Sequence, residues 1–541
     1  MSQDLIFIID YKKPIIYHQF QTILGKAMKR RDFIKSSGTL IGTAALSSCL
    51  GNPDISPKKN PNIVLIVADD LGYGELGCYG QQYIRTPHID NLAENGLKFT
   101  QHYSGSPVCA PSRCVLLTGK HTGHAFIRGN DEWGERGDVW SFEKMLEDPK
   151  LEGQRPLPSD EVTLPELLKK AGYTTACIGK WGLGPAFSEG SPNKQGFDTF
   201  FGYICQRWAH TYYPPFLWEN EERYPLDNKF VPLGTTIPEG ADPNDPESYS
   251  DFRLNEYAPA LMAEKALDFM EKSKNHPFFL YFPTTIPHVS LQAPKKYVDM
   301  YRSVFGDEEP YAGGYYFPCQ YPRATYAGMI THLDDQVGQI VQKLKQIGEY
   351  ENTLIIFTSD NGPTYTGGAD TPFFNSAGIF GEEQGRSKGF TYEGGIRIPM
   401  IASWPGIIKP GTHTDHISAF WDMLPTLCEL SGAKAPEDTD GLSLVPVLTG
   451  KGKRKFHDFL YWEFPAYNGQ QAVRTGPWKG IRKDIFDGNM KIELYNLEKD
   501  PNEQNDVSDK YPEVVRRIEQ IMKQQHIPSE IERFKFPQLG D

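Results

Sequence analysis

A cysteine and an arginine stand four residues apart in the segment CAPSR at residues 109–113. Pro111 suits the first turn of a helix and Gly119 suits its end, so Cys109 is predicted to lie at a helix N-terminus. Free amide donors and the helix dipole favour an anion there, and Arg113, about one turn on, can point back to the same place. This arrangement suits a nucleophile that attacks an anionic ester.

Four oxygen-bearing side chains, Asp69, Asp70, Asp360 and Asn361, follow two apolar runs of the sequence. Hard oxygen ligands without Cys or His favour Ca²⁺ or Mg²⁺ over zinc. On its own, the first pair can also cap a helix and the second can form a turn. The metal site is therefore one of two interpretations until other motifs are considered.

The elements that must position these residues are read from hydrophobic patterning. Residues 63–67, 278–282 and 354–357 are continuous apolar runs, typical of strands buried on both faces of a parallel sheet. An amphipathic helix is predicted within 333–344. Alternating strands and helices predict an α/β fold with a large, mostly parallel sheet flanked by helices, and functional side chains at the strands' carboxyl ends.

Residues 451–541 have a different pattern. Short segments at 459–462 and 492–495 are separated by turns, and a helix is predicted from about 512 to 525. We therefore expect a catalytic α/β domain at 61–450 and a C-terminal α+β subdomain at 451–541, which carries a smaller antiparallel sheet plus a helix.

Composition excludes some classes of function. The chain has 541 residues, more than one ordinary core holds, and its net charge of −13 argues against nucleic acid as a partner. Eight cysteines occur without paired CxxC spacing, so no zinc ribbon is visible.

The N-terminal region is predicted to direct export. Within residues 28–49, the string RRDFIK resembles a twin-arginine signal, a short apolar stretch follows, and LSSC resembles a lipobox ending at Cys49. A buried helix followed by a chance cysteine is the alternative. Residues 1–27 would be an upstream extension and 50–60 a linker. We expect a location in the periplasm or cell envelope, with membrane contact only through a lipid on Cys49.

The CAPSR segment followed by LLTG at 116–119 resembles the signature of the formylglycine-dependent, arylsulfatase-like sulfatases of the alkaline phosphatase superfamily. Further segments follow the family's order: PNIVLIVADDLGYGELG at 61–77, GKW at 179–181, PH at 287–288, SDNG at 359–362, KGFTYEGG at 388–395, and LYNL at 494–497 with DP at 500–501. The resemblance therefore covers most of the chain.

The resemblance implies a cofactor made from the protein itself. Cys109 would be oxidised to formylglycine by a formylglycine-generating or radical maturation enzyme. Its hydrate would supply the attacking hydroxyl, and the resulting sulfate hemiacetal would collapse to release sulfate. The metal would be Ca²⁺, bound by Asp69, Asp70, Asp360 and Asn361, with residue 109 completing its shell.

The resemblance also assigns the cations and the acid. Arg113, Lys180 and Lys388 match positions that hold the formylglycine and the sulfate oxygens, where fixed positive charge stabilises the transition state. His288 matches the histidine on the leaving-group side and is the predicted general acid. By its surroundings alone, a histidine after a proline is usually a loop residue.

One position departs from the family pattern. The family often has GKWHLG, with a histidine that contacts the formylglycine, whereas this chain has Gly182 at that place. His121 or His124 is a candidate replacement, or this branch works without one.

The predicted substrate is a sulfated polysaccharide or its fragments. The aromatic-rich stretch 208–218 and the loop 126–133 are candidate sugar-binding segments. Candidate contacts are His124, Arg128, Asn130, His210 and Tyr212.

Two other functions are considered. A two-metal phosphatase would need further ligands, for which Asp415 and His416 are the only tempting pair. A non-catalytic surface lipoprotein that binds sulfated glycan would explain Gly182, but the intact Cys109 and Arg113 argue against it. Metal content and turnover of an aryl sulfate separate these alternatives.

Overall fold

The computed structural model describes residues 60–381 and 385–541. The predicted extension, the signal segment with Cys49, and linker residues 50–59 lie outside the described residues. Among the helices that are described, none has the length and apolar character needed to cross a membrane.

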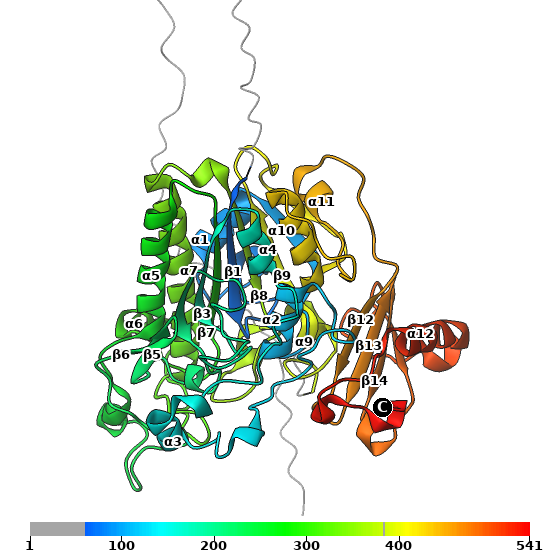
Figure 1. Cartoon of the computed structure of the whole chain (residues 1–541). Coiled ribbons are helices and arrows are strands. Elements are labelled where there is room, and N and C mark those ends of the chain that lie inside the picture. Colours follow the sequence, from blue (N-terminus) through cyan, green and yellow to red (C-terminus); the bar gives the residue numbers. More distant parts are fainter. Residues whose placement is uncertain (1–59, 382–384) are drawn as a thin grey trace, which may run out of the picture. The chain divides into compact units, whose positions relative to one another are not determined.

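A large sheet forms the centre of the α/β part of the chain (Figure 1). Its strands span Asn62–Asp69 (β1), Leu97–Tyr103 (β2), Thr174–Lys180 (β3), Thr199–Tyr203 (β4), Phe216–Glu219 (β5), Glu222–Pro225 (β6), Phe278–Pro287 (β7), Thr353–Ser359 (β8), Arg397–Ser403 (β9), Thr412–Thr414 (β10) and Ser418–Ala419 (β11). The order is β10-β2-β9-β8-β1-β7-β3-β4-β5-β6, and β11 pairs with β2.

The middle of this sheet is parallel, as the apolar runs predicted. Ile63 of β1 pairs with Phe279 of β7 on one side and with Leu354 of β8 on the other. β3 pairs in parallel with both β7 and β4, whereas β9 runs antiparallel to β8 and β2. Every residue of β1, β7 and β8 is buried, which explains why these strands have no polar face.

Helices cover the large sheet on both faces. The helices span Pro87–Glu94 (α1), Cys109–Thr118 (α2), Phe142–Glu147 (α3), Leu164–Lys170 (α4), Ala258–Ser273 (α5), Lys295–Phe305 (α6), Pro322–Gln346 (α7), Thr371–Phe374 (α8), Glu393–Ile396 (α9), Met423–Ser431 (α10), Val445–Thr449 (α11) and Pro512–Gln525 (α12). On one face α5 packs against β7, and α1 and α6 pack against α7; on the other, α10 packs against α2 and α4 (Figure 1). The predicted α/β architecture is confirmed.

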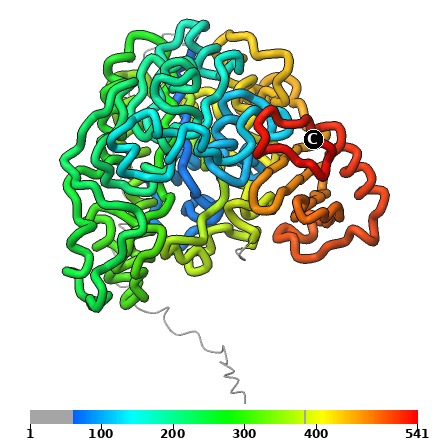
Figure 2. Tube along the Cα trace, turned by 60° about the horizontal axis from the view of Figure 1, so that its bottom comes forward, coloured from blue at the N-terminus to red at the C-terminus, as the bar shows by residue number. Residues whose placement is uncertain are grey.

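A second, smaller sheet follows in the chain. Leu460–Phe464 (β12), Gln470–Thr475 (β13), Trp478–Lys483 (β14) and Glu493–Asn496 (β15) pair antiparallel in sequence order. The apolar side of α12 packs on this sheet, with Ile518 and Met522 in the same buried cluster as Val473. The predicted antiparallel sheet plus helix is therefore present. Figure 2 shows this segment, in orange to red, beside the α/β part.

Candidate active site

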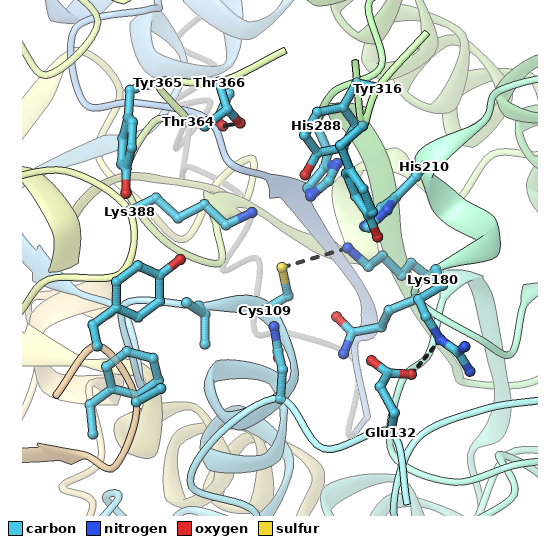
Figure 3. Close-up of a pocket in the computed structure, with 18 of the residues that line it drawn as sticks. Cys109, Glu132, Lys180, His210, His288, Tyr316, Thr364, Tyr365, Thr366 and Lys388 are labelled. Carbon is cyan, nitrogen blue, oxygen red and sulfur yellow. Dashed lines mark hydrogen bonds and ion pairs between the residues drawn. The ribbon is translucent and has the colours of Figure 1, made fainter. Parts of the chain in front are cut away.

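Four parallel strands end at one edge of the large sheet, and each delivers polar residues there. β1 ends at Asp69, β3 ends at Lys180, β7 is followed by His288, and β8 is followed by Asp360. A cavity of about 390 Å³ opens at this edge, and Cys109, Lys180, His210, His288 and Lys388 are among its lining residues (Figure 3). Its size is typical of small-molecule sites.

Cys109 is the first residue of α2, after an extended Val108, as the motif predicted. Its Sγ atom lies 3.4 Å from Asp69 Oδ1 and 3.5 Å from Lys180 Nζ. Burial, reinforced by Asp69, raises the pKa of the Cys109 thiol to about 12, although Lys180 and Lys388 act in the opposite direction. The thiol is therefore uncharged at neutral pH and is a poor nucleophile in that form.

The predicted metal ligands converge beside Cys109. Asn361 Nδ2 donates to Asp70 Oδ1 at 2.8 Å, and the Asp70 backbone N–H donates to Asp360 Oδ1 at 3.1 Å. Asp70 adopts a left-handed backbone conformation, with φ of 65°. This conformation is rare for a residue other than glycine and is typical of functional sites.

The chemistry of this donor set fits a divalent cation. Asp69, Asp70 and Asp360 are completely buried together, and burial with the repulsion of Asp69 raises the pKa of Asp360 to about 7 despite Arg113. Asn361 Oδ1 is a buried acceptor with no hydrogen-bond donor among the described residues. A cation would compensate the carboxylates and satisfy this oxygen.

Lys180 and Lys388 line the cavity, whereas Arg113 does not. Lys180 Nζ contacts Asp69 at 2.6 Å and Lys388 Nζ contacts Asp70 at 2.7 Å, and Figure 3 shows the two lysines on opposite sides of Cys109. Arg113 Nη2 lies 2.9 Å from Asp360 and 3.5 Å from Asp69, so in this structure the guanidinium contacts carboxylates of the site.

His288 lines the cavity, and both its imidazole ring and its backbone carbonyl make contacts that fix its position. The Val289 carbonyl accepts from Nδ1, and Nε2 lies 3.6 Å from Asp70 Oδ2. The Tyr212 hydroxyl donates to the His288 carbonyl at 2.6 Å, and the Tyr212 side chain is buried and does not line the cavity. Burial, together with Lys388 and Lys180, holds the pKa of His288 well below its usual value.

The candidate sugar contacts divide into two groups. His210 and Asn130 line the cavity, and His210 stacks on His288 with ring centroids 4.9 Å apart. Arg128 and His124 do not line it. The Arg128 guanidinium is buried against Glu463 at 2.5 Å, and His124 Nδ1 lies 2.9 Å from Asp440, so both side chains are committed to contacts elsewhere in the fold.

The histidine missing at Gly182 is not replaced by either predicted residue. His121 Nε2 contacts Gln525 at 3.1 Å and, like His124, lies outside the cavity lining. Gly182 has φ of 84°, and a Cβ atom there would lie 2.7 Å from Gln206 Cγ. Gln206, which lines the cavity, therefore occupies the space beside Gly182.

Sequence reasoning missed much of the cavity wall. Glu132 belongs to the loop that was selected for sugar binding, and Arg207 directly precedes the selected aromatic stretch. Trp140 and Arg533 also line the cavity, but neither lies in or beside a segment that was selected for sugar binding. Arg533 comes from the far end of the sequence. Asp415 and His416, the ligands that a second metal would need, do not line this cavity.

Two family models match the chain. The family model named Sulfatase matches residues 61–433, and the model named N-sulphoglucosamine sulphohydrolase, C-terminal, matches residues 381–527.

Among curated relatives, arylsulfatase A of Homo sapiens is 32% identical over 507 residues, which cover 86% of this chain and 88% of the relative. N-acetylgalactosamine-6-sulfatase of Homo sapiens is 28% identical over 508 residues, covering 86% and 85%. The crystal structure of Ps i-CgsB in complex with k-i-k-neocarrahexaose is similar with a TM-score of 0.68 and 27% identity, covering 86% of this chain and 94% of that one.

Proposed function

This chain belongs to the sulfatase family and is a sulfuric ester hydrolase, and from that premise we propose that it removes sulfate from saccharides with formylglycine at position 109 and calcium as its metal. The observation that carries the proposal is the position of Cys109, at a helix N-terminus between Asp69 and Lys180 on the cavity floor. The proposed calcium ligands are Asp69, Asp70, Asp360, Asn361 and residue 109.

Calcium and formylglycine would supply one part of the chemistry, and the cationic side chains of the site supply another. Bound calcium would polarise the sulfate oxygens, and the formylglycine hydrate would supply the attacking hydroxyl. Lys180 and Lys388 flank residue 109 and donate N–H groups where charge shifts among the sulfate oxygens. Arg113 keeps Asp69 and Asp360 in place.

His288 is the proposed donor of a proton to the leaving oxygen. Because Nδ1 is bound to the Val289 carbonyl, Nε2 is the nitrogen that can serve the cavity. Donation from Nε2 needs an imidazolium, and an arriving anionic ester favours that form electrostatically.

A saccharide substrate is supported by the wall and by the relatives. Trp140 and Tyr315 line the cavity and are more than half exposed, as ring-stacking residues would be. One relative is named for N-acetylgalactosamine 6-sulfate groups, and a similar solved structure holds k-i-k-neocarrahexaose.

We also propose that the enzyme is exported and attached to a membrane by a lipid on Cys49. The support is the order of features within residues 28–49, where a twin arginine precedes a short apolar stretch and a lipobox.

Mass spectrometry of active enzyme tests the proposal directly. The peptide that contains residue 109 should carry an aldehyde or its hydrate, elemental analysis should find calcium, and turnover should follow the modified fraction across preparations. The Cys109→Ala variant should fold and lose turnover. Full activity from protein wholly in the thiol form, or stoichiometric zinc as the required metal, would contradict it.

A further inference from the structure

We propose that one wall of the cavity, formed by Glu132, Trp140, Gln206 and Arg207, binds a second anionic group on the substrate, which is a carboxylate or another sulfate. We call these four residues the second subsite. The inference rests on the proposed function and deepens it, because it makes the substrate a saccharide with an acidic group in addition to the sulfate that is cleaved.

The first observation is a buried arginine with free donors. Arg207 is 2% exposed and lines the cavity, and its Nε lies 2.5 Å from Glu132 Oε2. Its Nη1 and Nη2 atoms have no acceptor in hydrogen-bond geometry among the residues that the structure describes, although the guanidinium also interacts with the Cys205 side chain. Buried donors are almost always paired in folded proteins, so these two point to a ligand.

The second observation is that Gln206, the residue before Arg207, also has a buried donor without a hydrogen-bond acceptor. Gln206 is 5% exposed and lines the cavity, and its Nε2 also lacks a partner within the described ranges. All the unpaired atoms of Gln206 and Arg207 are donors. The group that satisfies them must therefore supply acceptors, and a carboxylate or sulfate supplies two or three in the plane that a guanidinium fork matches.

Charge selects an anion over a neutral hydroxyl. Lys180, Lys388 and Arg533 of the lining are paired with aspartates outside it. Arg207 is paired with the single carboxylate of the lining, Glu132. That carboxylate faces Arg207 through one oxygen, which also accepts from Gln154 Nε2 at 2.8 Å. Glu132 therefore holds the guanidinium in place while Nη1 and Nη2 remain available. A charged acceptor makes stronger hydrogen bonds to such a group than a hydroxyl does.

An exposed aromatic ring lies next to these donors. The Arg207 guanidinium is 5.1 Å from the centroid of the Trp140 ring, and Trp140 is 63% exposed. A sugar ring can pack on such a face. Figure 3 places Glu132 on the side of Cys109 opposite Lys388, so this wall is separate from the Lys388 side of the site.

The test compares three matched disaccharides that carry the same cleavable sulfate. One has a neutral neighbouring sugar, one has a uronic acid and one has a second sulfate. Wild-type kcat/KM should be about 10- to 100-fold higher for at least one acidic substrate than for the neutral one, the range expected for hydrogen bonds between charged groups. The larger ratio identifies the source of the anion. Equal kcat/KM on all three overturns the inference.

Substitutions test whether the preference for acidic disaccharides depends on Arg207. Arg207→Met should bring the acidic-to-neutral ratio close to one, and Arg207→Lys should leave an intermediate ratio, because lysine keeps the charge but loses the fork. Arg253→Met, an exposed arginine paired with Glu247, is the matched control and should leave the ratio unchanged. A preference that survives Arg207→Met overturns the inference.

Two measurements separate this inference from the proposed function. Turnover of an aryl sulfate reports sulfate hydrolysis alone, so a wild-type enzyme that cleaves it without preferring acidic disaccharides refutes only the second subsite. Calorimetric affinities of the three disaccharides for the Cys109→Ala protein report the preference without catalysis. If Arg207→Met does not fold, the Arg207→Lys ratio decides, and a ratio equal to that of the wild type overturns the inference.

Discussion

At the scale of single residues, the site is a set of buried charges that constrain one another. Asp69 is held by Lys180 and Arg113, and Asp70 by Lys388 and Asn361. Each carboxylate of this set therefore has a partner that fixes its direction. Removing one partner leaves a buried charge without compensation. The resulting loss in folding free energy is larger than the stabilisation that an exposed ion pair provides.

Asn361 provides a test of the metal that does not remove a charge. Asn361→Leu keeps a similar volume but lacks the Oδ1 acceptor that no described residue satisfies. We expect weaker calcium binding, measured as occupancy after dialysis against graded calcium, and a roughly parallel fall in aryl sulfate turnover. Exposed Asn505→Leu is the control. Unchanged calcium occupancy in Asn361→Leu would mean that the amide is not a ligand.

His288 is tested by comparing leaving groups. A sugar alkoxide needs a proton in the transition state, whereas a nitrophenolate needs little help. General acid catalysis is worth about 10²–10⁴-fold, so His288→Ala should lose activity in this range on a sulfated sugar and much less on nitrophenyl sulfate. The comparison requires equal modification of residue 109. Equal losses on both substrates would mean that His288 only binds sulfate, and His210, stacked on it, becomes the next candidate acid.

At the scale of elements, the small sheet is connected to the chain's C-terminus through one histidine. His526 follows α12, and its ring nitrogens lie 2.8 Å from Glu463 of β12 and 2.6 Å from Asp541. Burial lowers the pKa of His526, but the two carboxylates outweigh it and raise the pKa above its usual value. The imidazolium therefore connects the end of α12 to β12 and to Asp541.

The sign of the pH effect follows from that raised pKa. A histidine that holds its proton more tightly when folded contributes stability that is complete below about pH 6.5 and is lost as pH rises through the folded pKa. We expect His526→Gln to lower stability by about 1–3 kcal/mol at mildly acidic pH and by less at alkaline pH. Thermal melts across this range measure it. A pH-independent deficit, or an equal effect of exposed His413→Gln, would refute the assignment.

At the scale of the whole molecule, a buried lysine attaches the small sheet to the active-site part of the chain. Lys479 of β14 is fully buried and contacts Glu393 of α9 at 2.9 Å and Glu503 at 3.1 Å. Glu393 lies only five residues after Lys388, so this ion pair supports the segment that carries an active-site cation.

We expect Lys479→Met to destabilise the protein by about 3–5 kcal/mol, because buried Glu503 loses its counter-charge and Glu393 keeps only its pair with Arg397. Denaturant unfolding followed by circular dichroism measures this. Lys483→Met on the same strand is the control, since Lys483 is 39% exposed and pairs with Glu493 at 3.1 Å. Its expected effect is about 0–1 kcal/mol. Similar effects of the two variants would show that the buried pair has no special role.

The sequence by itself determined the chemistry and the local structure of this protein. Hydrophobic runs that are buried on both faces are readable as parallel strands, so β1, β7 and β8 were located and the residues at their ends were correctly placed together. Cys109 at a helix start followed from Pro111 and Gly119, because capping depends on neighbouring residues.

Only the tertiary structure decided which side chains face the cavity. Arg128 and His124 have the right chemistry for sugar binding, but packing against Glu463 and Asp440 directs them elsewhere. Gln206 stands beside Gly182, and Arg533 reaches the wall from the C-terminal segment, because chain crossings bring distant residues together. Neither spacing nor composition encodes such contacts locally, since they depend on the packing of elements that are far apart in the sequence.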